Sequence, residues 1–243
     1  MKNRRIKVVV CGVAGRMGSA VTDCFQAAEG VEVTYGVERK DHPDVGGNLK
    51  GVPIVGDLSS AIEDADCIVD FTGPSFTDEL VKQGKARRKS LVIGTTNLSA
   101  GSMGAISDAS KSIPIVLSPN MSPAMNVLLK IVPDVARTLS KGFDISIVET
   151  HHRWKKDSPS GTARKLGQIL KDITNSEPQV KSLRIGGVVG EHVVTFAGEG
   201  EVLKLVHSAL SRQAFAFGAL LAVKFAVEAN PGLYGMSDVL KMR

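Results

Sequence analysis

A glycine-rich turn close to the N-terminus places the strongest constraint on how this chain folds. The β-branched run Ile6–Cys11 ends at Gly12-Val-Ala-Gly-Arg-Met-Gly18, and residues 19–28 then have a helical pattern. Gly12 permits a tight turn, Gly15 permits close approach of the backbone to a pyrophosphate, and Gly18 permits the helix to pack on the strand. This order predicts a dinucleotide site with the phosphates at the helix N-terminus; the alternative is a glycine turn without a ligand.

The next strand ends at two charged residues that bear on the choice of cofactor. Residues 31–37 form an apolar run, and Glu38 and Arg39 follow it about twenty residues after the last glycine. In dinucleotide-binding folds this strand end holds the adenosine ribose, where a glutamate accepts from ribose hydroxyls and an arginine pairs with a 2′-phosphate. The adjacent pair predicts that both NADH and NADPH are accepted; the alternative is a solvated pair at a strand end.

Strand-like and helix-like runs alternate along the rest of the first half. They are, in order, strand 67–71, helix 76–88, strand 90–93, helix 99–110 and strand 113–117. This alternation predicts an α/β fold with a doubly wound parallel sheet of the Rossmann type. Ligands of such sheets bind beyond the carboxyl ends of the strands, so Gly94, Thr95 and Thr96 either line the nicotinamide end of the cofactor or form a plain turn.

The alternation stops at Ser122-Pro123, where we place a domain boundary. A helical pattern over 126–139 comes next, and strand-like runs separated by glycine turns predict a smaller α+β domain with an open mixed sheet. These runs are 183–185, 188–189, 192–196 and 202–207. A long apolar helix over 212–229 then returns the chain to the first domain. We therefore expect a dinucleotide-binding domain formed by residues 1–122 and 213–243, and a substrate-binding domain formed by residues 123–212.

The segment from Glu149 to Ala163 concentrates the chemically active side chains. It contains His151, His152 and Lys155, and it ends in Ser160-Gly161-Thr162 before a helix-like run. Histidine exchanges protons near neutral pH, lysine supplies a cation or an acid, and a Ser-Gly-Thr turn at a helix N-terminus presents backbone N–H groups to an anion. The set predicts a site for a small carboxylated substrate; the alternative is a solvated basic loop in which the serine only caps the helix.

A metal site is not expected in this segment. Adjacent histidines point in diverging directions on a strand, and no cysteine or carboxylate completes a tetrahedral zinc set at the usual spacing.

The composition excludes several classes of function. The 243 residues are 43% hydrophobic, which is enough for a packed core, and the net charge of +5 is spread along the chain. Aromatic residues make up only 5%, so no nucleic-acid partner is expected, and the positive charge suits small anions. Cys11, Cys24 and Cys67 have neither metal-like nor disulfide-like spacing, which predicts a reducing, cytoplasmic setting. The apolar run after Met1–Arg5 is too short for a signal sequence or a membrane span, so no membrane partner is expected.

Together these motifs resemble the dihydrodipicolinate reductase family, also called 4-hydroxy-tetrahydrodipicolinate reductases, of lysine and diaminopimelate biosynthesis. The resemblance spans nearly the whole chain. Its most specific element is the family motif Glu-x-His-His-x-x-Lys-x-Asp-x-Pro-Ser-Gly-Thr-Ala, which residues 149–163 match. Other matching motifs are Gly-x-x-Gly-Arg-Met-Gly at 12–18, Asp-Phe-Thr at 70–72, Pro-Asn at 119–120 and Ser-Arg at 211–212.

The resemblance implies an NADPH- or NADH-dependent oxidoreductase that reduces a cyclic imine dicarboxylate, the dihydrodipicolinate precursor, to tetrahydrodipicolinate. It implies acid/base roles for His151 and Lys155, and it leaves open which of the two delivers the catalytic proton. It implies substrate contacts from His152, Ser160, Gly161 and Thr162. It implies cofactor contacts from Gly12, Val13, Ala14, Gly15, Arg16, Met17, Glu38, Arg39, Gly94, Thr95, Thr96, Ser118, Pro119, Asn120 and Met121. The family is typically a homotetramer assembled through its C-terminal sheets, which implies that residues 123–212 also serve oligomerisation.

Two other functions share part of this pattern. A homoserine or semialdehyde dehydrogenase would share the first half, but a semialdehyde enzyme needs a nucleophilic cysteine in a polar loop, and none of the three cysteines meets this description. A non-catalytic dinucleotide-sensing regulator would keep the glycine turn, yet it would have no use for His151, His152 and Lys155.

Overall fold

The computed structural model describes residues 4–242, which form two compact units. One unit contains the described residues up to Ser122 together with those from Phe215 onward, and the other is Pro123–Ala214.

The first unit contains a long sheet with helices on both faces. Its strands are β1 (Ile6–Cys11), β2 (Val31–Val37), β3 (Asn48–Leu49), β4 (Val52–Val55), β5 (Cys67–Asp70), β6 (Ser90–Ile93), β7 (Pro114–Leu117) and β12 (Gly232–Tyr234). Its helices are α1 (Arg16–Gln26), α2 (Pro74–Ala86), α3 (Ala100–Ser110), α6 (Gln213–Ala226) and α7 (Met236–Val239), with a 3₁₀ turn at Leu58–Ser60.

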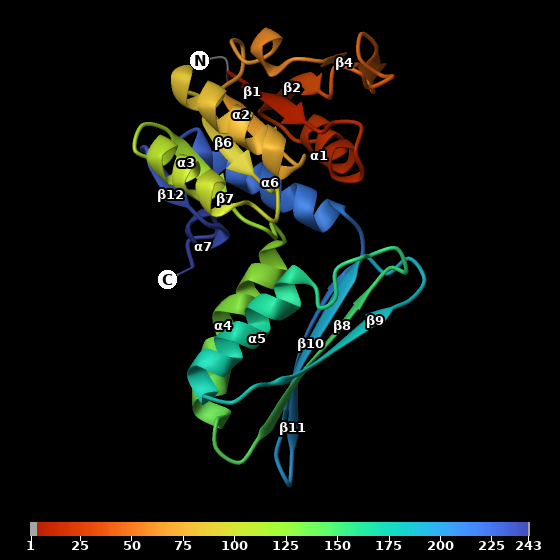
Figure 1. Ribbon diagram of the computed structural model, residues 1–243, viewed down its shortest axis with the longest axis vertical. Coiled ribbons are helices and arrows are strands. Elements are labelled where there is room, and N and C mark those ends of the chain that lie inside the picture. The colour runs from red at the N-terminus through yellow and green to blue at the C-terminus, as the bar shows by residue number, and fades with distance from the viewer. Residues whose placement is uncertain (1–3, 243) are drawn as a thin grey trace. The chain divides into compact units, whose positions relative to one another are not determined.

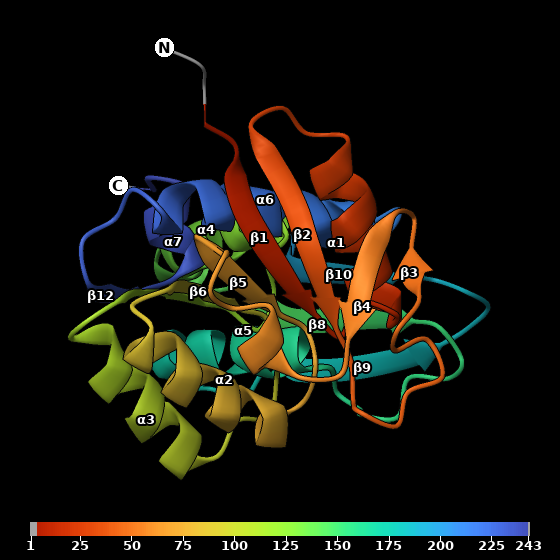
Figure 2. The ribbon, with the colours of Figure 1, turned by 90° about the horizontal axis from the view of Figure 1, so that it is seen from above.

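The strand order makes this sheet a doubly wound one. The order is β12-β7-β6-β5-β1-β2-β4-β3, and every pairing is parallel except that of β3 with β4. Seen from above, α1 and α6 lie on one side of the strands and α2 and α3 on the other (Figure 2). Strand β1 has β2 on one side and β5 on the other, so the order reverses at β1, and ligands of such sheets bind beyond the strand ends at this point.

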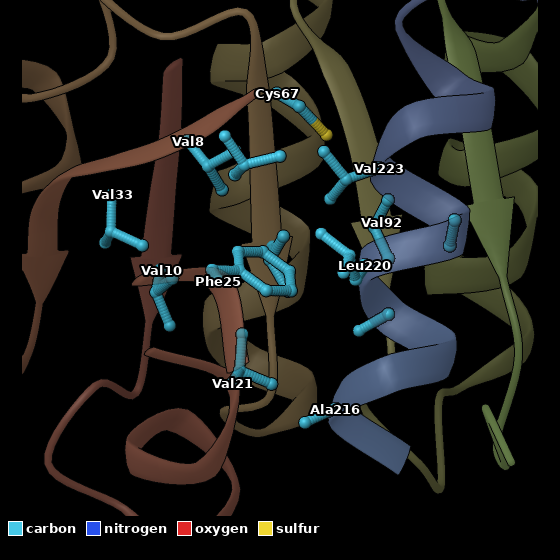
Figure 3. Close-up of a cluster of buried hydrophobic side chains, with 14 of the residues drawn as sticks. Val8, Val10, Val21, Phe25, Val33, Cys67, Val92, Ala216, Leu220 and Val223 are labelled. Carbon is cyan, nitrogen blue, oxygen red and sulfur yellow. The ribbon is translucent and has the colours of Figure 1, made fainter. Parts of the chain in front are cut away.

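Alternation along β1 divides the apolar core of this unit between the two faces. Val8 and Val10 point to the side of α1 and α6, where they pack with Phe25, and Figure 3 shows this cluster. Val9 and Cys11 point to the side of α2 and α3. Both faces of a parallel strand are thus buried, which is why Ile6–Cys11 is an almost continuous apolar run.

Two glycines of the first turn are required by geometry. Gly12 has a φ of +77°, a conformation that favours glycine. A Cβ on Gly18 would stand 2.0 Å from the carbonyl oxygen of Gly12, so the start of α1 approaches the turn more closely than any side chain allows.

The second unit packs two helices against one face of a mixed sheet. Its elements are α4 (Pro123–Leu139), β8 (Asp144–His151), α5 (Gly161–Thr174), β9 (Gln179–Arg184), β10 (Gly190–Ala197) and β11 (Val202–Ala209). The strand order is β11-β10-β8-β9, in which β8 and β9 are parallel and the other neighbours antiparallel. Figure 1 shows α4 and α5 side by side along this sheet. Their apolar residues pack with those of the inner sheet face, including Ile147, Val194 and Phe196.

The predicted fold class is confirmed, with a Rossmann-type sheet in one unit and a separate mixed sheet in the other. Several boundaries differ. The first helix begins at Arg16 instead of residue 19, β9 begins at Gln179 instead of 183, and residues 188–189 precede β10 instead of forming a strand. Strands β3, β4 and β12 were not predicted, because runs of two to four residues carry no readable periodicity. Among the helices of residues 4–242, none is long and apolar enough to cross a membrane.

Candidate active site

The Ser160-Gly161-Thr162 turn forms the N-terminus of helix α5. Ser160 is the N-cap, and its hydroxyl accepts a hydrogen bond from the backbone N–H of Ala163 at 3.2 Å. Gly161 and Thr162 are the first two helical residues, so their N–H groups belong to the positive end of a 14-residue helix. The structure therefore places the three predicted substrate contacts where an anion is stabilised.

Strand β8 carries a charged residue into the interior beneath this helix end. Glu149 is fully buried, and both of its oxygens accept several hydrogen bonds. Oε1 accepts from Arg184 Nη2 at 2.8 Å and from the backbone N–H of Ser160 at 3.1 Å. Oε2 accepts from Arg184 Nη1 at 2.9 Å and is also bonded to His151 Nδ1. Burial alone would raise the pKa of Glu149, but hydrogen bonds, first of all that from Arg184, lower this pKa to about 2.

The carboxylate of Glu149 fixes the tautomer of His151. An ionised carboxylate only accepts hydrogen bonds, so Nδ1 of His151 must carry its proton, and Nε2 is the nitrogen that gains or loses one. His151 ends strand β8 and is 9% exposed. Burial lowers the pKa of His151, and the nearby cations Lys155 and Arg184 lower it further. Glu149 raises this pKa, but the net effect is a lowering. The neutral ring therefore predominates at neutral pH.

The backbone at Gly190 lies close to the exchanging nitrogen of His151. A Cβ at Gly190, the first residue of β10, would stand 3.0 Å from Nε2. That distance is tighter than nearly all side-chain contacts, so any larger residue would press against this nitrogen.

A second buried histidine lies beside the first. His192 pairs in register with Glu149 of β8 on one side and with His207 of β11 on the other. Its Nε2 is 3.1 Å from the hydroxyl of Ser160, and its ring meets that of His151 edge-on at 5.3 Å between centroids. Burial lowers the pKa of His192 to about 4, assisted by the neighbouring His151, so His192 is neutral under physiological conditions.

Lys155 and His152 lie in the loop that follows β8. Lys155 Nζ forms an ion pair with Asp157 at 2.7 Å, and its side chain is 23% exposed. The ring of His152 lies 5.9 Å from that of Trp154, which is 68% exposed. Glu149 thus joins His151 directly to Ser160, whereas His152 and Lys155 stand on the more open loop between them.

The first unit presents a glycine turn and a helix N-terminus at the reversal point of its sheet. Gly15 is the N-cap of α1, and among residues 4–242 no side chain caps this helix. Arg16 and Met17 begin the helix, and Val13 is buried against Gly36, where a Cβ would stand 2.5 Å from Val13 Cγ1. Free helix N-termini after a glycine turn bind phosphate groups, so these residues fit a pyrophosphate.

The two charged residues after β2 have different surroundings. Glu38 Oε1 accepts a hydrogen bond of 2.9 Å from the backbone N–H of Ala14, which ties the end of β2 to the glycine turn. The side chain of Arg39 is 77% exposed, with a loose 3.9 Å ion pair to Asp41. Glu38 is therefore held in place, whereas Arg39 is accessible to a ligand.

A second buried carboxylate organises the neighbouring loops. Asp70, the last residue of β5, is fully buried. It accepts hydrogen bonds from the backbone N–H of Thr72 at 2.9 Å and from the hydroxyls of Thr72 and Thr77 at 2.5 Å each and of Thr95 at 3.0 Å. Asp70 thereby fixes the Gly94-Thr95-Thr96 segment against the loop after β5. A Cβ on Gly94 would stand 2.2 Å from the ring of Phe71, so this contact also requires glycine.

The segment after β7 is held by local hydrogen bonds. The hydroxyl of Ser118 donates to the carbonyl of Asn120 at 2.8 Å, and the side-chain oxygen of Asn120 accepts from the N–H of Ser122 at 3.0 Å. Pro119 lies within this turn, and Met121 is buried against α6, where a Cβ on Gly218 would stand 1.7 Å from the carbonyl oxygen of Met121.

The sequence analysis gave no role to several residues that organise these sites. Asp70 and Glu149 stood in matched motifs without an assignment, and Arg184, Gly190 and His192 were not singled out. The burial of Glu149 could have been predicted, because alternation along the strand places it on the same inward face of β8 as Ile145 and Ile147. Its pairing with Arg184, 35 residues away, depends on the β8–β9 register.

Comparisons with known proteins were consistent along the chain. Residues 6–121 match the family model "Dihydrodipicolinate reductase, N-terminus" and residues 124–240 match "Dihydrodipicolinate reductase, C-terminus". The chain is 38% identical to a 4-hydroxy-tetrahydrodipicolinate reductase of Syntrophobacter fumaroxidans and 36% identical to one of Citrifermentans bemidjiense. Each of these matches covers 98% of this chain and 100% of the relative. The fold is similar to that of a dipicolinate-bound dihydrodipicolinate reductase from Paenisporosarcina sp. TG-14, with a TM-score of 0.83 and 23% identity over 96% of this chain and 99% of that one.

Replacing Asp70 tests whether its hydrogen bonds prepare the first unit for a cofactor. We expect Asp70→Asn to weaken NADPH binding about 10-fold or more, because a hydrogen bond to a charged group is worth about 1.5–3 kcal/mol and Thr95 would lose such a bond. Titration of cofactor fluorescence measures this. The control is Asp108→Asn on the surface of α3, which should leave binding unchanged. Equal affinities of Asp70→Asn and the parent protein would refute the role of Asp70.

Proposed function

The chain belongs to the dihydrodipicolinate reductase family, and from this membership we propose which of its residues carry the reaction. Its function is that of a 4-hydroxy-tetrahydrodipicolinate reductase, an NADH- or NADPH-dependent oxidoreductase of lysine and diaminopimelate biosynthesis. The observation that carries the assignment of residues is the cluster of His151 and the α5 N-terminus around Glu149. A semialdehyde dehydrogenase is not supported, since burial raises the pKa of all three thiols, those of Cys11, Cys24 and Cys67.

We assign substrate binding to the second unit. A dicarboxylate needs cations and N–H donors, which Lys155, His152 and the Ser160-Gly161-Thr162 turn supply. The relative from Paenisporosarcina sp. TG-14 was solved with dipicolinate, itself a cyclic dicarboxylate, which supports a ligand of this chemistry here.

The proton is assigned to the residues beside this anion site. Hydride addition to the conjugated imine is balanced by one proton on the neighbouring carbon, after a hydroxyl group has left as water. Nε2 is the nitrogen of His151 that would take up and deliver this proton, since Nδ1 is bonded to Glu149. Lys155 Nζ is the second candidate donor, and it also pairs with a substrate carboxylate.

The cofactor is assigned to the first unit. When bound, the reduced nicotinamide supplies the hydride. Gly12, Gly15 and the uncapped start of α1 would hold its pyrophosphate, together with Val13, Ala14, Arg16 and Met17. Glu38 and Arg39 would hold the adenosine ribose. Gly94, Thr95, Thr96 and residues 118–121 would line the nicotinamide end, which Asp70 braces through Thr95.

We also infer a homotetramer in a reducing cytoplasm. The sheet face of the second unit opposite α4 and α5 carries exposed apolar side chains among charged ones, since Val202 and Val206 are each 57% exposed and Leu183 is 47% exposed. Such a face suits a second copy of the chain; the number four follows from the family resemblance. Free cysteines support the reducing setting.

Substitution of His151 tests the proton assignment. The assay follows NADPH oxidation with enzymatically generated dihydrodipicolinate. We expect His151→Ala to lower kcat by about 10²- to 10⁴-fold, the usual contribution of a positioned acid, with little change in NADPH affinity. Undiminished turnover would reject the role of His151. Lys155→Ala in the same assay separates the two donors, because an increase in KM alone would restrict Lys155 to binding.

Arg39 determines the preference between the two cofactors. We expect Arg39→Ala to weaken NADPH binding about 10-fold and to leave NADH binding nearly unchanged, because a contact to the 2′-phosphate is worth about 1.5–3 kcal/mol. Dissociation constants of both cofactors measure this. The adjacent Lys40→Ala, which removes another exposed cation, is the control. Equal losses for NADPH and NADH would contradict the assignment.

The assembly surface is tested by introducing a charge. We expect Val206→Glu to reduce the mass measured by light scattering from that of a tetramer, because a carboxylate buried between two sheets is left unpaired. The matched control is Ile131→Glu, 40% exposed on α4 in the opposite layer of the same unit. An unchanged mass for Val206→Glu would exclude this face as the interface.

A further inference from the structure

We propose that the buried carboxylate of Glu149 and the partly exposed guanidinium of Arg184 form a positioning pair that selects the nitrogen at which His151 exchanges its proton and controls how readily it does so. The pair acts through His151, so this inference rests on the proposed function. It assigns a role to two residues that stand outside the proposed catalytic and substrate-binding set.

The carboxylate of the pair is not placed to meet a ligand directly. Glu149 is fully buried, and its two oxygens are occupied by Arg184, Ser160 and His151. The guanidinium of Arg184 forms the two parallel bonds of a bidentate pair with Glu149 and also donates to the carbonyls of Asp157 and Leu183. Both oxygens of Glu149 are thus bonded within the protein, and the carboxylate influences a ligand through the groups that it holds.

Geometry makes His151 the recipient of that influence. Arg184 faces His151 across the β8–β9 register, and Glu149 precedes His151 by two residues on the same face of β8. Because Glu149 accepts a hydrogen bond from Nδ1–H, Nε2 is left as the exchanging atom. The same carboxylate holds the backbone of Ser160, so one group sets the proton donor and the anion-binding helix end at a fixed spacing.

The two charges act on His151 with opposite sign. Glu149 favours the protonated ring, whereas Arg184 disfavours it and also offsets part of the carboxylate charge. The other groups that face His151 are Lys155 from the loop, which disfavours protonation, and the neutral His192 from β10. The charge state of His151 therefore depends on both members of the pair.

The test measures the His151 proton directly and the reaction separately. The chain has only five histidines, so NMR of labelled imidazoles can resolve the titration of His151 in the intact protein. We expect Glu149→Gln to shift this titration to lower pH, since it removes the favourable charge, and Arg184→Gln to shift it to higher pH. The control Glu177→Gln, at an exposed ion pair with Lys171, should not move it. In the rate assay, the fall of kcat/KM with rising pH should move in the same direction as each titration.

The outcomes separate this proposal from the role of His151 itself. Opposite NMR shifts without movement of the rate profile would reject His151 as the proton donor and leave the positioning pair standing. Shifts in the same direction, or no shift in either variant, would overturn the positioning pair whatever the rates show.

A further variant covers the case in which Arg184→Gln fails to fold because Glu149 is left unpaired. The double variant Glu149→Gln/Arg184→Gln removes both charges together, and its His151 should titrate at higher pH than in Glu149→Gln alone. A titration at the same or lower pH would refute the contribution of Arg184.

Discussion

The hydrogen bonds of the buried Glu149 carboxylate are the interactions on which the candidate site of the second unit depends. The carboxylate joins three separate segments, the end of β8, the end of β9 and the start of α5, through four hydrogen bonds. A charge in the interior is tolerated only when it is paired and fully hydrogen-bonded, so each of these segments must be in place for the others to be stable. The loop between Glu149 and Ser160 is consequently anchored at both ends, although its middle, with Lys155 and Trp154, is more exposed.

The first unit also contains a buried carboxylate at the end of a strand, but its hydrogen-bond donors are different. Asp70 also ends a central strand and is also fully buried, but it accepts hydrogen bonds from the hydroxyls of three threonines and from one backbone N–H instead of from an arginine. Hydroxyl donors neutralise no charge, so the carboxylate keeps its field at the strand ends where ligands of such sheets bind. In the second unit, Arg184 cancels much of the field of Glu149, which leaves the positive end of α5 free to attract an anion.

The sequence was sufficient for the fold class and for the location of the candidate residues, but not for the connections between them. Local signals made the fold class predictable. The strands Ile6–Cys11 and Val31–Val37 were predicted with their observed bounds, because each β-branched run ends abruptly at a glycine or at a charged residue. The motif at 149–163 identified His151 and Ser160, yet nothing in it indicates that Glu149 binds both. Arg184 and His192 reach the site only through strand register, and register follows from the packing of whole strands.

Stability alone does not account for a buried pair such as Glu149 and Arg184. Desolvation of two charges offsets most of their attraction, and apolar residues of similar volume often give an equally stable core, whereas removal of one partner costs about 3–5 kcal/mol. Such a pair fixes the positions of the groups bonded to it more than it stabilises the fold, since each oxygen of Glu149 accepts hydrogen bonds from particular donors. Along the inward face of β8, Ile145 and Ile147 belong to the apolar core. The next two inward residues, Glu149 and His151, are a carboxylate and an imidazole. The apolar core therefore ends at Glu149, which is the first charged residue on the inward face of β8.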